Sequence, residues 1–440
     1  MSGSPSYPGP KARSIIERMR RVEGAGPRTG SGDPLVVDHA MGATLVDPDG
    51  NRFTDLAGSF AAATIGHSHP DVVAAVAAQV GTASHVSSAS LSEQRVGFEE
   101  DLVGIAPGGL DRVLLGISGA DANDTAIKLA RSRTGRREVL AFSGGYFGRA
   151  GGVVGLNGKS TFRARVGADA GAHFLPYPDP YRWPDELGGG SAAGDGALRL
   201  VRDALEDPAS GVGPLAAIVI EPIQGNGGII SPPDGFLEGL RALCDAHGIT
   251  LIFDEIQSGF GRSGRMWAAE HWGVAPDLMT VGKGIGGGMA LSAVVGRAQA
   301  MSHWPAGTHT STFLGNAVNL AAGRAAIRVM CRDRLWERSA QLGGRLRARL
   351  AEALGEHPRI GDIRGRGLFI GIELVRDRTT KDPDPEAAAV VRARAFEGGV
   401  VIAVAGRHEQ VVKISPPLTI DEDQASDAVD VVIDAIRRGR

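Results

Sequence analysis

Short apolar segments alternate with amphipathic helical segments through the middle of this chain, from about residue 71 to residue 297. The apolar runs read RVLLGIS, EVLAFS, LAAIVIEP, TLIFDE, DLMTVG and LSAVVG. Helical periodicity lies between several of them, for example at 122–133 and 235–247. Short strands that are almost continuously apolar, separated by helices, are typical of a mostly parallel sheet covered on both faces. The pattern therefore predicts an α/β fold with a large central sheet.

The regions on either side of this core follow other patterns. We expect a loose tail at 1–10, a helix at 11–21 and a glycine-rich loop to residue 33, followed by two short strands in PLVVDHA and ATLVDPDG. Glycine and serine enrichment at 186–196 suggests a mobile surface insert. After the core, strands are expected in GLFIGIEL, VVIAVA and VVKISPP, and helices are expected at 316–332, 335–352 and 421–438.

These elements divide the chain into three predicted parts. Residues 1–60 form an N-terminal segment that joins the small domain, residues 61–332 form the large domain, and residues 333–440 form a small α+β domain. The composition is that of an ordinary globular protein, with 42% hydrophobic and 22% charged residues among 440. The chain therefore has enough apolar residues for a sizeable core.

Charge and hydropathy exclude some classes of partner. The formal net charge is −3 and the pI is about 6.4, which gives no electrostatic reason to expect nucleic acid or an anionic membrane surface as a partner. No stretch approaches the roughly 20 apolar residues of a membrane span. The N-terminal residues are polar and proline-rich and lack the apolar region of a signal peptide. We therefore expect a cytoplasmic protein.

Two charged residues end neighbouring apolar runs. Asp254 closes the run TLIFD, and Lys283 follows the run DLMTV between two glycines. Ligands of open α/β sheets bind at the carboxyl ends of the strands, and 29 residues (283 − 254) is about one strand–helix–strand passage. Taken alone, Asp254 is also compatible with a helix N-cap or an ion pair, and a lone strand-end lysine is more often exposed.

An acid and an amine that meet in one dry site suit a pyridine aldehyde. Burial lowers the pKa of a lysine from about 10.4 and makes its amine a nucleophile toward carbonyls. An acid beside the pyridine nitrogen keeps the ring protonated, so that the ring withdraws electrons. In GISGADANDTAIKLAR, a strand leads through Ser118 into a helix, whose first N–H groups favour a phosphate.

These three motifs together resemble the class III (ornithine/GABA-type) aminotransferases of pyridoxal-5′-phosphate (PLP) fold type I. The resemblance extends from about residue 33 to the C-terminus. It implies that Lys283 forms the Schiff base and carries the proton, that Asp254 pairs with the pyridine nitrogen and that Gln257 approaches the ring hydroxyl. It also implies that Gly119 and Ala120, after Ser118, offer backbone N–H groups to the phosphate.

Four further segments extend the resemblance. In FSGGYFGR, Tyr146 matches the aromatic residue that stacks on the cofactor ring, and in EPIQGNGG, Glu221 matches the glutamate near the substrate pocket. In HTSTFLGN, Thr312 matches the residue that reaches the phosphate of the neighbouring subunit, which implies a homodimer. RGRGLFIGIEL matches the small-domain strand motif. The implied substrates are amines and keto or aldehyde compounds.

The chain departs from the family pattern at three positions. Ala120 stands where serine or threonine is common, and Phe147 stands where histidine is frequent. Where the family often reads L-R-x-x-P-P-L, with an arginine that clamps the substrate carboxylate, this chain has VVKISPPL and Lys413. Lysine is a point charge that cannot form a bidentate fork with a carboxylate.

The change to lysine leaves the substrate open. Lys413 either binds a carboxylate loosely or points to solvent. Without the arginine, Glu221 is available to face a cationic group of the substrate. We therefore hypothesise an amine or amino-sugar substrate, such as an aminoglycoside-like antibiotic precursor.

The nearest alternative is a racemase or epimerase. The segments LPYPDPYR, SGADAND and GKGIGGG resemble the branch with aminocaprolactam racemase and isoleucine 2-epimerase. Such an enzyme needs a second proton donor on the face opposite Lys283, and Tyr146 is a candidate for it.

Other functional classes have less support. GGVVGLNGKST resembles a phosphate-binding loop, but Val153 stands where its first glycine is needed. His67 and His69 are spaced like metal ligands but have no further ligand nearby, so we expect them to shape a loop and expect no metal site.

Overall fold

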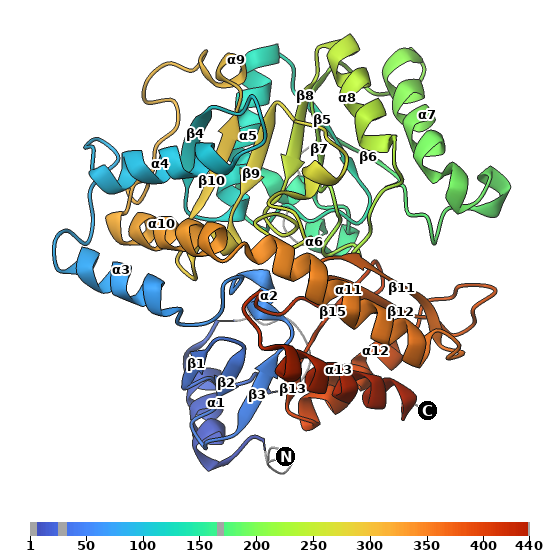
Figure 1. Ribbon diagram of the computed structural model, residues 1–440. Helices are drawn as coiled ribbons and strands as arrows, with labels where there is room; N and C mark the ends of the chain where they lie inside the picture. Colours follow the sequence, from blue (N-terminus) through green and yellow to red (C-terminus); the bar gives the residue numbers. More distant parts are fainter. Residues whose placement is uncertain (1–6, 25–32, 165–170, 439–440) are drawn as a thin grey trace.

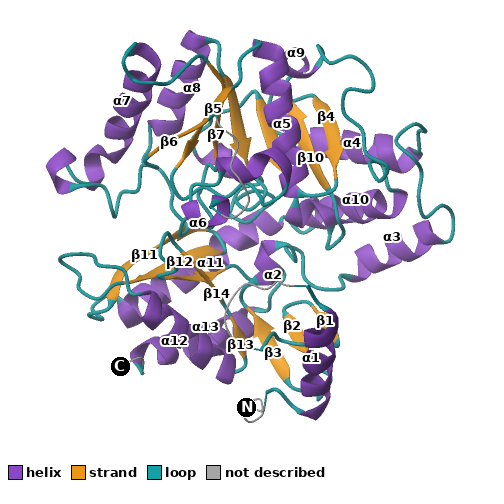
Figure 2. Cartoon of the chain, turned by 180° about the vertical axis from the view of Figure 1, so that it is seen from behind, coloured by secondary structure: helices purple, strands orange, loops and turns teal. Residues whose placement is uncertain are grey.

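The computed structural model describes residues 7–24, 33–164 and 171–438, and its largest sheet has seven strands (Figures 1 and 2). The order is β4-β10-β9-β8-β7-β5-β6. Strand β10 is antiparallel to both of its neighbours, and the other pairs are parallel. The strands are β4 (Arg112–Gly116), β5 (Glu138–Phe142), β6 (Ala172–Leu175), β7 (Leu215–Ile220), β8 (Thr250–Asp254), β9 (Leu278–Val281) and β10 (Ser292–Gly296).

Alternate residues of the central strands explain why helices cover both faces. On β5, Val139 and Ala141 belong to the apolar cluster that contains α5, whereas Leu140 and Phe142 belong to the cluster that contains α7 and α8. A strand that is buried on both sides needs apolar residues at every position, as the sequence pattern predicts. The covering helices are α4 (Glu93–Ile105), α5 (Gly119–Thr134), α7 (Ala193–Glu206), α8 (Phe236–His247) and α10 (Ala317–Arg332).

The small domain is built on a second sheet, of order β11-β12-β15-β14. Its elements are α11 (Leu335–Leu354), β11 (Ile360–Arg366), β12 (Phe369–Leu374), α12 (Pro385–Glu397), β13 (Val400–Val401), β14 (Ala403–Ala405), β15 (Val411–Ile414) and α13 (Glu422–Arg437). A third sheet, β1-β2-β3-β13, joins the N-terminal segment to this domain, because β3 pairs with β13 in parallel. Its N-terminal elements are α1 (Pro10–Val22), β1 (His39–Met41), β2 (Thr44–Val46) and β3 (Arg52–Asp55).

Short elements connect these layers. They are α2 (Gly58–Ala61), α3 (Pro70–Val80), η1 (Gly151–Leu156), α6 (Ser160–Arg163), η2 (Asp185–Leu187), η3 (Gly190–Ala192), η4 (Ala268–His271), η5 (Lys283–Gly286) and α9 (Ala298–Met301). Within the described ranges, no helix is both long and apolar enough to cross a lipid bilayer.

The predicted fold class is confirmed, with local corrections. The segment 186–196 is not a loose insert, because its second half begins α7 and Ala193 is fully buried. The edge strand β6 was not predicted, since its four residues include a polar histidine and lie next to a glycine-rich stretch. Of the loose tail expected at 1–10, residues 1–6 lie outside the described residues, as does most of the glycine-rich loop, 25–32, whereas Tyr7 packs against Phe53 and Phe396 and is not loose. The domain boundaries at residues 60 and 332 stay predictions.

A buried ionic network joins the two domains. Glu373 on β12 is fully buried and lies 2.5 Å from Arg182 Nε, which belongs to the loop after β6. Its other carboxylate oxygen lies 2.5 Å from Arg364 Nη1 on β11. Two guanidinium groups thus share one carboxylate that has little access to water. Removing one member of such a network leaves an uncompensated buried charge, so the network fixes how the domains meet.

Candidate active site

The site lies where two neighbouring parallel strands of the large sheet end. Asp254 is the last residue of β8 and is in register with Thr280 on β9. Lys283 follows the end of β9 by two residues and begins η5. The structure thus places the predicted acid and the predicted amine at one edge of the sheet, as the strand-end argument requires.

The carboxylate of Asp254 is held by two donors. It is only 3% exposed, and its two oxygens accept hydrogen bonds from Asn123 Nδ2 at 2.8 Å and from the backbone N–H of Ile256 at 2.9 Å. Asp254 caps no helix, and within the described part of the chain it takes part in no ion pair. The two alternative interpretations of Asp254, a helix N-cap and an ion pair, are therefore wrong.

Asn123, which the sequence did not single out, is itself fixed from both ends. Its side-chain oxygen accepts a hydrogen bond from Thr280 Oγ1 at 2.8 Å, so its amide nitrogen must face Asp254. The same nitrogen donates to the carbonyl of Phe147 at 3.1 Å. Asn123 lies in the first turns of α5, inside a motif that was noted only for its phosphate-binding start.

The electrostatics of Asp254 favour a cation in the site. Burial raises the pKa of Asp254 to about 6, although the hydrogen bonds from Asn123 and Ile256 and the charge of Lys283 act to lower it. A positively charged group brought against this carboxylate would offset the cost of burying it. A protonated pyridine nitrogen is such a group.

Lys283 is prepared to act as a nucleophile. Burial lowers the pKa of Lys283, against the opposing charges of Asp254 and Glu221, and the nearby Arg262 lowers it further. Its backbone has φ of +46°, in the left-handed region that residues other than glycine seldom adopt. Strain of this kind is maintained at functional sites by the surrounding structure.

The start of α5 offers the predicted phosphate site. Ser118 is the N-cap, and its hydroxyl accepts a hydrogen bond from the N–H of Asp121 at 3.2 Å. Gly119 and Ala120 are the first two residues of the helix, and N–H groups at these positions have no partner within a helix. They remain available for an anion, whereas the Ser118 hydroxyl is already used by the cap.

Glu221 is held in place by backbone donors. Its oxygens accept hydrogen bonds from the N–H groups of Tyr146 at 2.9 Å and Gly225 at 2.8 Å. Burial raises the pKa of Glu221 to about 7, and the charge of Asp254 adds to the increase. The ring of Tyr146 meets Phe162 edge to face, with centroids 5.6 Å apart. Glu221 thus positions the loop that carries Tyr146.

Gln257 approaches the same loop closely. A side chain at Gly225 would collide with the amide of Gln257, so only glycine leaves room for it. The predicted neighbour of the ring hydroxyl therefore lies beside the segment that holds Glu221.

Lys413 does not point to solvent. It lies on β15 opposite Gly371 and is 4% exposed, with Nζ 5.9 Å from the centroid of the Phe369 ring. Burial lowers the pKa of Lys413 to about 7, and the charges of Lys283 and Arg262 contribute. Within the described residues, Nζ has neither a hydrogen bond nor an ion pair. It is a second buried amine near Lys283.

The other residues named from the sequence, Thr312, His67 and His69, take no part in the contacts described above. Thr312 is exposed, and among the described residues its side chain makes no hydrogen bond, so a single chain does not bring it to the others. His67 lies 2.9 Å from an oxygen of Asp55, and His69 caps α3 by accepting from Asp71 at 3.3 Å. The described residues contain no cluster of three or more candidate metal ligands.

Comparison with known proteins identifies the family of this site. The family model described as Aminotransferase class-III matches residues 27–436. The chain belongs to the class III aminotransferases. The predicted family and fold type are therefore confirmed.

Similar class III proteins differ in the reactions they are named for. The chain is 40% identical to isoleucine 2-epimerase of Lentilactobacillus buchneri, over 91% of this chain and 89% of that protein. It is 39% identical to 5-aminovalerate aminotransferase of Pseudomonas putida, over 92% and 94%. A solved amine transaminase from an uncultivated Pseudomonas species, in its PLP-bound form, superposes with a TM-score of 0.88 at 31% identity, covering 95% of this chain and 99% of that one.

PLP is the cofactor of this class III protein, as predicted. The residues present fit it: Asp254 is a buried acid with no ion-pair partner among the residues that the structure describes, Lys283 is an amine with a lowered pKa, and the first N–H groups of α5 can take a phosphate. These three features correspond to the ring nitrogen, the aldehyde and the phosphate of PLP.

The Thr280 hydroxyl provides a test of how Asp254 is held. Thr280→Val removes the group that orients Asn123 while keeping the side-chain shape, so we expect turnover to fall about tenfold, the effect of losing roughly 1.4 kcal/mol at the acid. Thr280→Ser keeps the hydroxyl and should retain most of the activity. Steady-state kinetics of the PLP-loaded variants measures both. Equal activity of the two variants would show that Asn123 needs no orientation by Thr280.

Proposed function

We propose that this protein is an aminotransferase that moves an amino group from an amine or amino-acid donor to a carbonyl acceptor. The observation that supports this most directly is a buried carboxylate without an ion-pair partner beside an amine of lowered pKa, at adjacent strand ends. Membership of the class III family and similarity to named aminotransferases support the same reaction.

Lys283 and Asp254 have distinct roles in this proposal. When bound, PLP supplies an aldehyde and a ring that withdraws electrons from the substrate carbon. Lys283 Nζ would hold the cofactor, and as a free amine it would take the proton from the substrate carbon. Because Asp254 keeps its charge beside the ring nitrogen, it stabilises the protonated ring throughout.

Other residues position the reactants. We assign the phosphate to the N–H groups of Gly119 and Ala120, with Ser118 fixing the start of the helix. Tyr146 covers one face of the ring, and Gln257 contacts its hydroxyl. Because α5 carries both the phosphate site and Asn123, it aligns the phosphate with Asp254.

We infer a homodimer in which Thr312 completes the partner's phosphate site. Several large apolar side chains are exposed on the single chain, including Met41, Phe60, Leu91 and Phe313, each more than half exposed. Phe313 is adjacent to Thr312, and its ring lies 5.3 Å from that of His85. An exposed aromatic side chain next to Thr312 suits a position at a subunit interface, where aromatic residues are enriched.

A racemase or epimerase is the second candidate. It is favoured by the 40% identity to isoleucine 2-epimerase and by a second buried amine, Lys413, in addition to Tyr146. Inversion requires one group to remove a proton and another to supply one on the opposite face. A lysine whose pKa is about 7 exists in both protonation states near neutral pH.

Two assays without an acceptor distinguish an aminotransferase from a racemase or epimerase. An aminotransferase given an amine donor alone converts its cofactor to the pyridoxamine form, and we expect the absorbance of the yellow enzyme to bleach accordingly. A panel of amines, amino acids and aminoglycosides identifies the donor. Inversion of one enantiomer in heavy water, with deuterium incorporation, no acceptor and no bleaching, would contradict the aminotransferase assignment. Lys283→Ala should show neither change.

The substrate class depends on Lys413. Each oxygen of Glu221 already accepts one backbone hydrogen bond, so the glutamate keeps only part of its capacity for a cationic substrate group. The amino-sugar hypothesis therefore stays a prediction. A substrate carboxylate near Lys413 would find a cation only while that amine is protonated.

This requirement gives a pH dependence with a definite sign. Because burial lowers the pKa of Lys413 to about 7, its charge is lost as the pH rises through this value. For a carboxylate-bearing substrate we expect KM to rise above about pH 7, and we expect Lys413→Arg to remove this rise. Because the pKa of Glu221 also lies near 7, Glu221 can contribute to the pH profile of KM as well. The test is therefore the difference between the pH profiles of the wild-type protein and Lys413→Arg. Identical pH profiles would exclude a contact between Lys413 and the carboxylate.

A further inference from the structure

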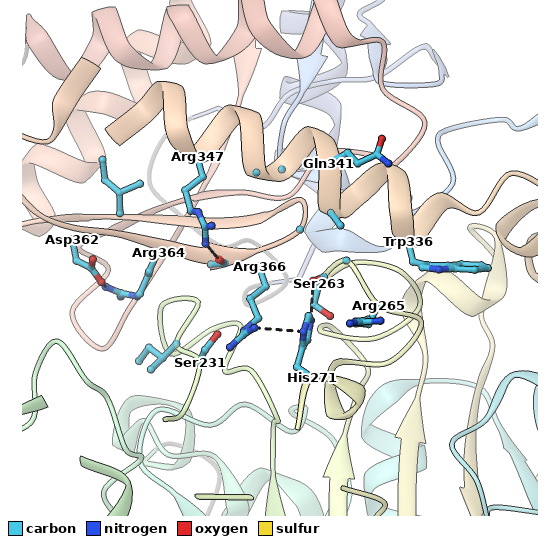
Figure 3. A pocket seen from close by; sticks show the side chains of 18 of the residues that line it. Ser231, Ser263, Arg265, His271, Trp336, Gln341, Arg347, Asp362, Arg364 and Arg366 are labelled. Atoms are coloured by element: carbon cyan, nitrogen blue, oxygen red, sulfur yellow. Dashed lines mark hydrogen bonds and ion pairs between the residues drawn. The ribbon is translucent and has the colours of Figure 1, made fainter. Parts of the chain in front are cut away.

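A cavity of about 900 Å³ lies between the large and the small domain (Figure 3). Helix α11 and strand β11 of the small domain form one wall, and large-domain loops that contain Ser231, Ser263 and His271 form the other. None of Lys283, Asp254, Glu221 and Lys413 lines it. The cavity is therefore separate from the site described above, and its volume lies in the range of small-molecule pockets, roughly 300–1,000 Å³.

Three arginines of its lining, Arg265, Arg347 and Arg366, form no direct ion pair with any residue in the described ranges, whereas Arg364 is paired with Asp362 and Glu373. The acids of the lining are already engaged. Asp362 pairs with Arg364, and Glu337 pairs with Arg334.

Asp179, the third acid of the lining, is hydrogen-bonded to backbone N–H groups of the protein. One of its oxygens accepts hydrogen bonds from the N–H groups of Tyr181 and Arg182, and burial raises its pKa. Only longer-range negative charge from Asp234 acts on Arg366, and Glu270 interacts with Arg265 in the same way, so the guanidinium groups of the cavity keep unused hydrogen-bond donors.

Unpartnered hydroxyl groups line the same cavity. Ser231 Oγ, Ser263 Oγ and Tyr181 OH are buried atoms without a hydrogen-bond partner among the described residues. Ser263 is only 1% exposed. These hydroxyl groups have unused hydrogen-bonding capacity beside the cavity, although their oxygens have little accessible surface.

The central arginine is already oriented. Arg366 lies over the ring of Trp272, 5.1 Å from its centroid, and its Nη1 approaches His271 Nδ1 at 3.5 Å. His271 Nε2 lies 3.0 Å from the carbonyl of Ser263 and donates to it, which leaves Nδ1 as the acceptor. Burial together with Arg366 and Arg265 lowers the pKa of His271 to about 4, so the ring is neutral. In Figure 3, Arg366, His271 and Arg265 lie below α11, the helix that carries Arg347.

We propose that this cavity binds a small molecule that carries a phosphate group. The lining offers three guanidinium groups without a direct ion pair, and although Arg347 donates to the carbonyl of Gly365 and Arg366 to His271, each keeps further N–H donors. Guanidinium forks match phosphate oxygens geometrically, and a phosphate accepts more hydrogen bonds at higher charge than a carboxylate does. Because Arg347 comes from α11 and Arg265 from the large domain, the ligand bridges the two domains and stabilises their contact.

Titration calorimetry with pyrophosphate and with inorganic phosphate tests this site. The PLP-loaded enzyme is first reduced with borohydride, so that the cofactor remains in place and its own phosphate site is unavailable. We expect saturable binding and a raised melting temperature. Arg265→Gln and Arg347→Gln should each weaken the binding about tenfold or more. Both side chains are exposed and form no ion pair in the described ranges, and Arg347 loses only its hydrogen bond to the carbonyl of Gly365, so the variants should fold normally.

Arg349→Gln is the matched control. Arg349 lies on the same helix but pairs with Asp430, outside the cavity, so its removal should leave the affinity unchanged. Equal affinity in all three variants would place the binding elsewhere and overturn the proposal. An absence of binding at about 10 mM anion, an affinity weaker than roughly 3 kcal/mol, would also overturn it. Equal affinity for succinate would overturn the assignment to phosphate.

Discussion

The arrangement of the site depends on one buried carboxylate. Asp254 lies at the end of a strand with apolar neighbours on both faces, where burial raises its pKa, and two neutral donors hold it in place. Neutral donors orient the group but leave its charge uncompensated. The site is therefore built to receive a cation, and the protonated ring nitrogen of PLP is the cation that the class III family provides. Lys283 follows the neighbouring strand β9, and it lies at the same edge because parallel strands end on the same side of a sheet.

The same low-polarity environment affects every titratable group around it. Burial lowers the pKa of Lys283, lowers that of Lys413 to about 7 and raises that of Glu221 to about 7. The pKa values of Lys413 and Glu221 thus approach one another near neutrality, which is where proton transfer between groups is most efficient. With a second amine on β15, this chain has a group at that position that can lose its charge in this range, which an arginine would not do.

The sequence predicted those parts of the site that follow from strand ends. Asp254 and Lys283 each follow an apolar run, and parallel strands bring their carboxyl ends to one edge. Asn123 could not be predicted in its role, because that role depends on how the first turns of α5 pack against β8 and β9. Neither could the burial of Lys413, since alternation along a short strand does not show which side faces another domain.

The cavity between the domains could not be predicted from the sequence either. Its arginines come from a large-domain loop, α11 and β11, and only the docking of the two domains brings them together. The edge strand β6 was missed for a related reason, because its pairing with β5, rather than its own composition, defines it.

Reduction of the purified yellow enzyme with borohydride, followed by peptide mapping, tests the central assignment most directly. The treatment fixes the cofactor on whichever amine holds it. We expect the label on the peptide that contains Lys283 and on no other. A label on Lys413, on any further lysine, or on no peptide at all would contradict the placement of the cofactor beside Asp254.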